Sequence, residues 1–174
     1  VVDASNFDVK NISKLIFPGI GNFNNISDYI FKNKIDLKIK RLISKKIPYL
    51  GVCVGMQILL EESDESTSSK GLGIIKGKVR KINSNKISCP HNGWNNNKGH
   101  KKTKLFNNIK NIEDFYFNHS FYCDVEEKKI ITRTLSDDKK IITSFEKDSI
   151  YGVQFHPEKS HDSGIKILNN FISI

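Results

Sequence analysis

The chain has 174 residues and a mass of 19.9 kDa, the size of one globular domain whose core can hold a pocket. Hydrophobic residues make up 37% and charged residues 27%, and only 4 prolines and 11 glycines occur, which excludes disordered and collagen-like proteins. No apolar run approaches the roughly 20 residues that a membrane-spanning helix needs, and the N-terminal residues lack the pattern of a signal peptide. We therefore expect a soluble, cytoplasmic protein without a membrane partner.

The net charge is +9, from 28 Lys and Arg residues against 19 Asp and Glu residues. Most positive residues are lysines spread along the chain, and a denser stretch from Lys98 to Lys104 is expected to be a surface loop. The sequence has no aromatic and basic motif of the kind that binds RNA. We interpret the charge as solvated surface and expect no nucleic-acid partner; a docking surface for an acidic or phosphorylated partner is the alternative.

The three cysteines, Cys53, Cys89 and Cys123, are widely spaced and form no C-x-x-C pair. This spacing argues against a zinc site and against a disulfide framework, so we expect reduced thiols. No His, Cys and carboxylate residues have the spacing of metal ligands, and we expect neither a metal nor an organic cofactor.

Strands and helices alternate in the first part of the chain, which predicts a parallel sheet covered by helices. Short apolar runs that end in turns indicate the strands, and apolar residues at helical spacing indicate the helices. The predicted strands are residues 14–17, ending at Pro18-Gly19, and 48–52; the predicted helices are 27–44, with Ser27 or Asp28 as N-cap, and 55–62.

From Gly71 onward, β-type segments joined by short turns predict antiparallel strands added to the parallel core. These segments are residues 71–82, 115–117, 121–122, 129–134, 141–145 and 150–155. A final helix is expected over residues 164–171, with Ile165, Leu168 and Phe171 on one face.

Cys53 stands between Gly51 and Gly55, after an apolar strand and before a predicted helix. This is the pattern of a nucleophile elbow, in which small neighbours permit a tight, strained turn that lifts the nucleophile above the sheet. The N-terminus of the helix is expected to lower the pKa of the thiol, and its free backbone N–H groups can face an oxyanion. A buried structural cysteine is the alternative for this motif taken alone.

A thiolate nucleophile needs a base that can also protonate the leaving group, and His156 ends a predicted strand. Glu158 follows two residues later, so in an extended chain its side chain lies on the same side and can hold the second imidazole nitrogen. Alone, His156 could equally be an ordinary core or surface histidine. Together with Cys53, the two residues meet the requirements for nucleophile, base and orienting group.

Residues 51–57 and 155–158 resemble the corresponding motifs of class I, triad-type glutamine amidotransferases. Within that class the chain is most similar to the glutaminase subunits of imidazole glycerol phosphate synthase. The matching segments follow in order along nearly the whole chain: 18–23, 51–59, 61–65, 71–79, 90–95, 116–120 and 151–160.

The resemblance implies a three-layer α/β fold, with a mostly parallel central sheet, helices on both faces and added antiparallel strands. It also implies a single amidotransferase domain over residues 1–174. The family has a strand and a helix before its Pro-Gly loop, whereas seventeen residues precede Pro18 here. We therefore expect the family's first strand and helix to be absent from this chain.

The resemblance implies that Cys53 attacks the carboxamide of L-glutamine, that His156 acts first as base and then as acid, and that Glu158 orients it. The oxyanion would be stabilised by the loop of Gly19 and Gly21 and by the N–H of Val54. Four further residues are implied to bind glutamine: Gln57, His119, Ser120 and Phe121.

The implied partner is a (β/α)8 cyclase or synthase subunit that forms a heterodimer with this chain. The residues that resemble the family's contacts with it are His91, Asn92, Trp94 and Lys159. A core position is the alternative for Trp94.

The implied function is hydrolysis of glutamine to glutamate and ammonia through a thioester on Cys53, with ammonia channelled to the synthase of histidine biosynthesis. One alternative keeps the chemistry and feeds the ammonia to a sugar-modifying synthase of surface-polysaccharide assembly. A second is a non-catalytic partner-binding subunit, which the intact set of Cys53, His156 and Glu158 disfavours. A papain-like hydrolase is also disfavoured, because it expects a distant Asn or Asp as third member.

Overall fold

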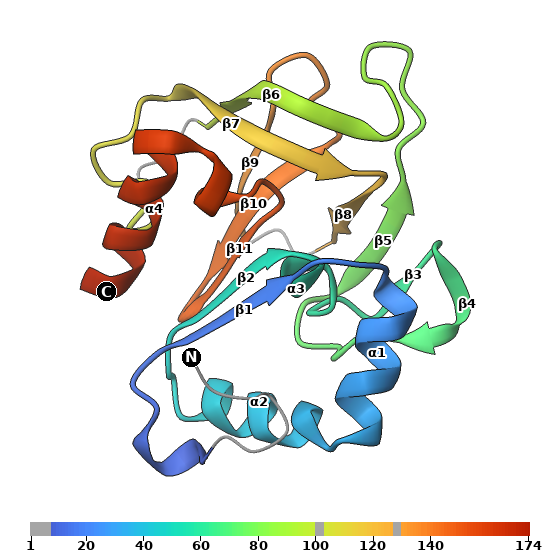
Figure 1. The fold of residues 1–174 in the computed structure, drawn as a ribbon, viewed down its shortest axis with the longest axis vertical. Coiled ribbons are helices and arrows are strands. Elements are labelled where there is room, and N and C mark those ends of the chain that lie inside the picture. The colour runs from blue at the N-terminus through green and yellow to red at the C-terminus, as the bar shows by residue number, and fades with distance from the viewer. Residues whose placement is uncertain (1–7, 100–102, 127–129) are drawn as a thin grey trace.

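The computed structural model describes residues 8–99, 103–126 and 130–174, which form a mixed sheet with helices on both faces (Figure 1). The helices are α1 Phe23–Lys32, α2 Ile35–Ser44, α3 Val54–Gln57 and α4 His161–Ser173, with 3-10 turns at Val9–Asn11 and Pro157–Lys159. The strands are β1 Leu15–Gly19, β2 Tyr49–Cys53, β3 Glu62–Ser63, β4 Ser66–Lys70, β5 Gly77–Lys81, β6 His91–Lys98, β7 Ile112–His119, β8 Phe121–Val125, β9 Ile131–Leu135, β10 Ile142–Lys147 and β11 Ile150–Val153.

The strands lie in the order β1-β2-β11-β10-β8-β5-β3-β4, and β6 pairs with both β7 and β9 beside this path. Among the described strands, β1–β2, β2–β11 and β3–β5 are parallel pairs, and the other pairs are antiparallel. The α/β fold with added antiparallel strands is confirmed, but the sheet is mixed rather than mostly parallel. Short turns join several strands in the second half of the chain, and short connections produce antiparallel neighbours.

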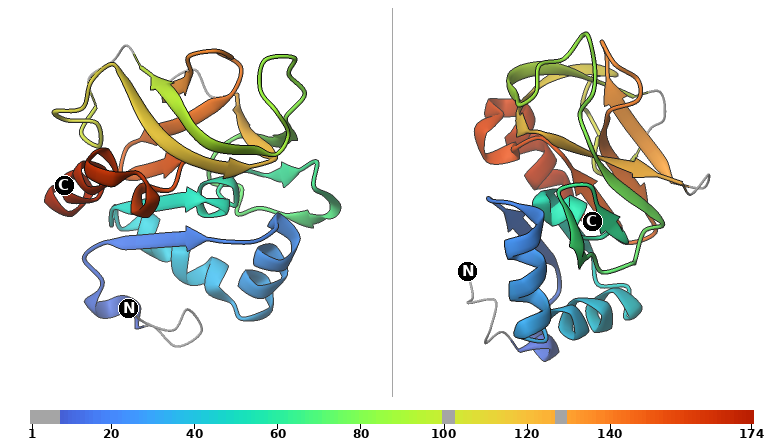
Figure 2. Two further views of the ribbon diagram at one scale, coloured as in Figure 1. Left: turned by 45° about the horizontal axis from the view of Figure 1, so that its top comes forward. Right: turned by 90° about the vertical axis from the view of Figure 1, so that its right-hand side faces the viewer.

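Two apolar cores lie on opposite faces of the sheet because successive side chains of a strand point to opposite sides. On β2, Tyr49 belongs to the core that contains Ile30 of α1 and Ile39 of α2. The next residue, Leu50, belongs to the core that contains Phe171 of α4. The expected helical layers on both faces are therefore present, and the two views of Figure 2 show α1 and α2 apart from α4.

The predicted helix over residues 27–44 consists of two helices, because the chain takes a left-handed conformation at Lys34 (φ 56°) between α1 and α2. The first of them begins four residues earlier than predicted. Its N-cap is Asn22, whose side-chain oxygen accepts a backbone N–H of the first turn, and not Ser27 or Asp28.

Two other helices also differ from the prediction. In place of a helix over residues 55–62, α3 covers only Val54–Gln57. In α4 the buried residues are Gly164, Ile167 and Phe171, while Ile165 is 56% exposed, so the inward face is rotated relative to the predicted one. Beyond residue 71, the β-type segments overlap described strands, although β5 covers only part of residues 71–82.

Strand β6 was not predicted, because its sequence is rich in asparagine and lacks an alternating apolar pattern. It pairs with β7 along its whole length, from His91 opposite His119 to Lys98 opposite Ile112. Lys98 thus ends a strand, and the predicted surface loop from Lys98 to Lys104 includes residues 100–102, which lie outside the described residues.

Candidate active site

The turn at Cys53 has the strained backbone that the elbow motif predicts. Cys53 ends β2 with φ 53° and ψ −113°, and α3 begins at the next residue, Val54. A Cβ at Gly51 would lie 2.2 Å from the carbonyl oxygen of Gly55, and a Cβ at Gly55 would lie 1.9 Å from that of Phe17. Both glycines are therefore needed for the backbone to approach itself so closely.

Parallel pairing of β2 with β11, in which Val153 lies opposite Val52, brings the residues that follow β11 to the edge of the sheet where the Cys53 turn lies. Gln154 follows β11, and its side-chain Nε2 donates a hydrogen bond to Cys53 Sγ at 3.5 Å. Two residues later, His156 is 4% exposed, and its Nδ1 lies 2.7 Å from Glu158 Oε1. The carboxylate thus engages Nδ1, and Nε2 is the ring nitrogen that it does not engage.

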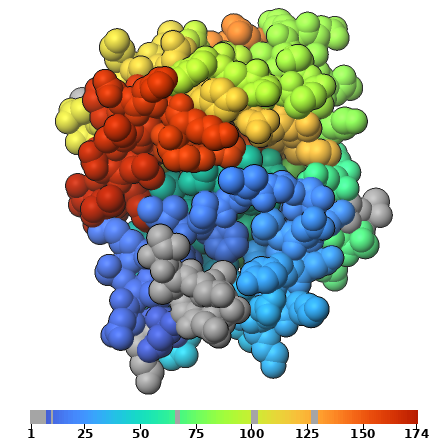
Figure 3. All heavy atoms as spheres, viewed as in Figure 1, coloured from blue at the N-terminus to red at the C-terminus, as the bar shows by residue number. Residues whose placement is uncertain are grey.

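Two hollows adjoin the predicted catalytic residues, and the loop of residues 18–21 contributes to both. Cys53 lines a cavity of about 200 Å³, here called the Cys53 cavity, together with Gly21, Val54, Gln57, Glu65, Pro90, Asn118, His119, Ser120 and Phe121. His156 and Glu158 line a hollow of about 320 Å³ with Ile16, Pro18, Gly19, Ile20, Val52, Pro157 and Leu168. In Figure 3 the N-terminal segment in blue and the C-terminal segment in red meet on the face shown.

All four residues predicted to bind glutamine therefore lie in one cavity with Cys53. The same cavity is lined by Glu65, a residue without a predicted role. The Oε2 atom of Glu65 accepts the backbone N–H of Phe23 at 2.8 Å, which holds the carboxylate at the start of α1. No local pattern distinguishes Glu65 from the other acidic residues between positions 61 and 65.

Burial raises the pKa of the Cys53 thiol from 9.0 to about 11. The backbone N–H of Val54 and the Gln154 side chain lower this pKa, and the carboxylates of Glu158 and Glu65 raise it. The predicted lowering of the thiol pKa is therefore wrong for the chain by itself. The physical reason is that the removal of water from the buried thiol raises its pKa by more than the one backbone N–H of the single-turn helix α3 lowers it.

Three of the residues predicted to meet a partner lie together on an exposed face. Trp94 is 47% exposed, so it is not a core residue, and its ring stacks on that of His161 with centroids 5.0 Å apart. Asn92 Oδ1 accepts the hydroxyl hydrogen of Tyr116 at 2.8 Å, and Lys159 Nζ lies 5.5 Å from the centroid of the same ring.

The fourth such residue, His91, lies inside the protein. Its side chain packs on the ring of Phe117, and its Nδ1 lies 2.9 Å from Nε2 of His119. At 6% exposure, His91 is not placed for the direct partner contact that was expected, because its side chain lies on the buried face of the β6–β7 pair, against Phe117 and His119.

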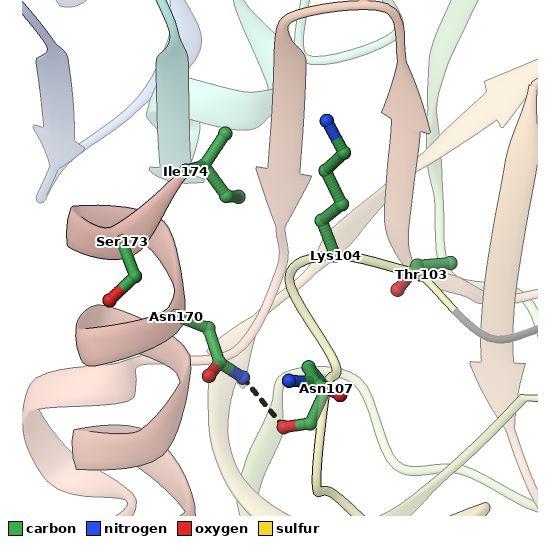
Figure 4. A pocket seen from close by; sticks show the side chains of 6 residues that line it. All are labelled: Thr103, Lys104, Asn107, Asn170, Ser173 and Ile174. Atoms are coloured by element: carbon green, nitrogen blue, oxygen red, sulfur yellow. Dashed lines mark hydrogen bonds between the residues drawn. The ribbon is translucent and has the colours of Figure 1, made fainter.

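A further hollow, of about 510 Å³, lies at the C-terminal end of α4 (Figure 4). It is lined by Thr103, Lys104, Asn107, Asn170, Ser173 and Ile174, and Asn170 Nδ2 donates to the backbone oxygen of Asn107 at 2.8 Å. None of the predicted site residues lines this hollow, so it is separate from the candidate active site.

Within residues 8–99, 103–126 and 130–174, no group of three or more His, Cys, Asp and Glu side chains is arranged to hold a metal ion. In the same part of the chain, no helix is both long and apolar enough to cross a membrane.

Comparison with known proteins places these features in a family. The family model of class-I glutamine amidotransferases matches residues 3–174. The chain belongs to the class-I glutamine amidotransferase family. Among curated relatives of this amidotransferase, imidazole glycerol phosphate synthase subunit HisH of Leptospira interrogans is 40% identical over 172 residues, which cover 96% of this chain and 84% of the relative. Subunit HisH of Pyrococcus furiosus is 40% identical over 95% of this chain and 84% of its own length.

Solved structures show the same fold at lower sequence identity. PurLQS from Thermotoga maritima matches this amidotransferase with a TM-score of 0.66 and 19% identity, over 91% of this chain and 78% of that chain. The glutaminase domain of Trypanosoma brucei CTPS matches with a TM-score of 0.64 and 14% identity, over 95% and 73% of the two chains.

Proposed function

We propose that this chain is the glutaminase subunit of an imidazole glycerol phosphate synthase, which hydrolyses L-glutamine to glutamate and ammonia for histidine biosynthesis. The observation that carries the proposal is the strained turn at Cys53, at the end of β2, on the same edge of the sheet as the hydrogen-bonded pair of His156 and Glu158 that follows β11. The similarity to HisH relatives over nearly the whole chain supports the pathway.

In the proposed reaction, His156 Nε2 takes the proton of the Cys53 thiol while Sγ attacks the carboxamide carbon of glutamine. His156 then gives this proton to the departing nitrogen, which leaves as ammonia, and a thioester remains on Cys53. A water molecule, deprotonated by His156, attacks the thioester; the C–S bond breaks, and glutamate and the thiol are released. Glu158 holds the imidazole through Nδ1 and stabilises its charged form.

The oxyanion of each tetrahedral intermediate is proposed to accept hydrogen bonds from the N–H of Val54 and from the loop of Gly19 and Gly21. Val54 already directs its N–H to the sulfur, since this group lowers the thiol pKa. Gly21 has φ 128°, a conformation that L side chains rarely adopt, and it lines the Cys53 cavity.

Glutamine is proposed to occupy the Cys53 cavity. The carboxylate of Glu65 is suited to the α-ammonium group, because it is the negative group among the described lining residues of this cavity. The segment of His119, Ser120 and Phe121 and the side chain of Gln57 line the same cavity and are proposed to contact the rest of the amino acid.

The partner is proposed to be a (β/α)8 cyclase subunit that forms a cytoplasmic heterodimer with this chain through the face of Asn92, Trp94 and Lys159. Trp94 supports this assignment, because a half-exposed tryptophan stacked on a neighbouring ring is a large, rigid contact surface.

The test measures ammonia release from glutamine by the chain with and without the cyclase subunit of the same organism, and the ribonucleotide substrate of the cyclase is supplied in parallel reactions. We expect hydrolysis that the partner stimulates, formation of imidazole glycerol phosphate, and complete loss of hydrolysis in the Cys53→Ala variant, which should still bind the partner. Hydrolysis retained by Cys53→Ala would contradict the mechanism. Stimulated hydrolysis without imidazole glycerol phosphate would instead favour the sugar-modifying pathway.

A further inference from the structure

A chain of hydrogen bonds runs from Asn95 of β6 through the buried rings of His91 and His119 to Phe121, which lines the Cys53 cavity. Asn95 Nδ2 lies 3.2 Å from His91 Nε2, His91 Nδ1 lies 2.9 Å from His119 Nε2, and His119 Nδ1 lies 2.8 Å from the backbone oxygen of Phe121. A carbonyl oxygen can only accept, so His119 Nδ1 must carry its hydrogen and His119 Nε2 must accept. His91 Nδ1 is then the donor to His119, and His91 Nε2 accepts from Asn95.

Both histidines are neutral in this arrangement. Burial lowers the pKa of His91, and it lowers the pKa of His119 to about 4. A neutral imidazole has one donor and one acceptor, and each ring uses both, so the hydrogen bonds fix the tautomer of each ring.

A second chain of hydrogen bonds joins the same carbonyl to the catalytic sulfur. The Phe121 oxygen also accepts from Gln57 Nε2 at 3.0 Å, and the same amide nitrogen donates to Gln154 Oε1 at 3.0 Å. Gln154 Nε2 then donates to Cys53 Sγ at 3.5 Å. The two chains meet at one oxygen atom, which has two lone pairs and accepts one hydrogen bond from each.

We infer that His91 is a positioning residue for catalysis by Cys53. By donating to His119 Nε2, His91 holds the His119 ring in the orientation in which its Nδ1–H fixes the Phe121 carbonyl. That carbonyl in turn orients the amide of Gln57, whose Nε2 donates to Gln154 Oε1. With its oxygen held there, the Gln154 amide directs its N–H group to the Cys53 sulfur. This inference rests on the proposed function, and it assigns His91 a role inside the chain rather than at the partner surface.

The physical basis is the cost of an unpaired polar atom in a buried site. Without the donor of His91, the Nε2 atom of His119 becomes an unpaired buried acceptor, and the ring keeps only the hydrogen bond from Nδ1 to the Phe121 oxygen. With one hydrogen bond in place of two, the ring can rotate toward another donor, and its Nδ1–H is drawn away from the Phe121 oxygen. The carbonyl and the amide that depends on it must then rearrange.

The first experiment measures the tautomer of His119 directly, from the ring ¹⁵N chemical shifts and their couplings to ring protons in the unmodified, labelled chain. We expect the Nδ1–H form for both His119 and His91. An Nε2–H form of His119 would overturn the inference, and this readout does not depend on any glutaminase activity. A chain that shows the expected tautomers but never hydrolyses glutamine would therefore refute the proposed function and leave the hydrogen-bond assignment intact.

The second experiment compares two variants of nearly equal shape, His91→Asn and His91→Leu. The amide nitrogen of the introduced asparagine stands at the position of Nδ1 along the side chain and retains a donor, whereas the introduced leucine has none. We expect His91→Leu to lower kcat for glutamine by about ten- to hundredfold, the equivalent of one lost buried hydrogen bond, with a smaller change in KM. His91→Asn should restore kcat to within about threefold of the unmodified chain.

The matched control is the Asn96→Ser variant. Asn96 is exposed on the same strand, β6, and its side chain belongs to neither chain of hydrogen bonds. This variant should leave kcat unchanged. Equal kcat values for His91→Leu and His91→Asn, both folded by circular dichroism, would overturn the inference, because a purely structural role does not distinguish the two by their donor. If His91→Leu does not fold, the tautomer measurement on the unmodified chain decides.

Discussion

In the isolated chain, the Cys53 thiol is expected to stay protonated at neutral pH. Burial raises its pKa from 9.0 to about 11, a shift of two units that corresponds to about 3 kcal/mol in favour of the protonated form. At pH 8, about one molecule in a thousand then carries the thiolate, which is about a hundredfold less than for a thiol of pKa 9.0. The unassisted nucleophile is therefore weak, and attack depends on proton transfer to His156.

The rate of alkylation by iodoacetamide reports the fraction of Cys53 that is ionised, because the thiolate and not the thiol reacts. Across pH 7 to 10 we expect the rate at Cys53 to rise about tenfold per pH unit without a plateau. Mass spectrometry of the digested protein separates Cys53 from the exposed Cys89, which reports how well the reagent reaches a surface thiol. The Cys53→Ala variant supplies the blank.

A plateau of the Cys53 rate below pH 9 would refute the reasoning, because it would mean that burial does not dominate the thiol pKa. Addition of the cyclase subunit is a second stage of the same assay. If partner docking activates the enzyme by opening the cavity to water or by adding N–H donors near the sulfur, the rate at a given pH should rise and the plateau should move to lower pH.

Four further outcomes are expected. Glu158→Gln should lower kcat for ammonia release by at least about a hundredfold with the fold unchanged, and an undiminished kcat would count against its role. Gly51→Ala should lower the free energy of unfolding in urea by about 3 kcal/mol or more, because its Cβ would lie 2.2 Å from the Gly55 oxygen. Trp94→Ala should weaken calorimetrically measured binding of the cyclase by about 2 kcal/mol while the melting temperature changes little. His119 is protonated near pH 6.5 in the unfolded chain and near pH 4 in the folded chain, so between these pH values the unfolded chain binds more protons. The free energy of unfolding should therefore fall by about 3 kcal/mol as the pH drops from 6.5 to 4. The His119→Gln variant should lack this part of the pH dependence.

The sequence by itself determined the residues whose signal is local. Cys53 could be recognised because glycines stand two residues to either side of it at the junction of a strand and a helix. The pairing of His156 with Glu158 could be predicted because an interval of two residues places both side chains on one side of an extended chain. The strands at residues 14–17 and 48–52 were predictable for a similar reason, since apolar runs that end in turns are short-range patterns.

Other features depended on partners far away in the sequence. Strand β6 is polar, and it is a strand because β7 and β9 supply its hydrogen bonds. The Oδ1 atom of its buried Asn97 accepts hydrogen bonds from Arg133 Nε at 3.1 Å and from Thr143 Oγ1 at 3.0 Å. An asparagine that the sequence pattern would place on the surface is therefore part of the interior. No periodicity along the chain encodes such a set of contacts.

The same is true of the chemistry around the sulfur. The hydrogen bond from Gln154 to Cys53 and the place of Glu65 in the cavity arise from tertiary packing, and the sequence singled out neither residue. Tertiary packing also determined the direction in which the pKa of the Cys53 thiol is shifted. A helix N-terminus can be read from the sequence, but the removal of water from Cys53 results from all the elements that pack around it, and this desolvation is the larger effect.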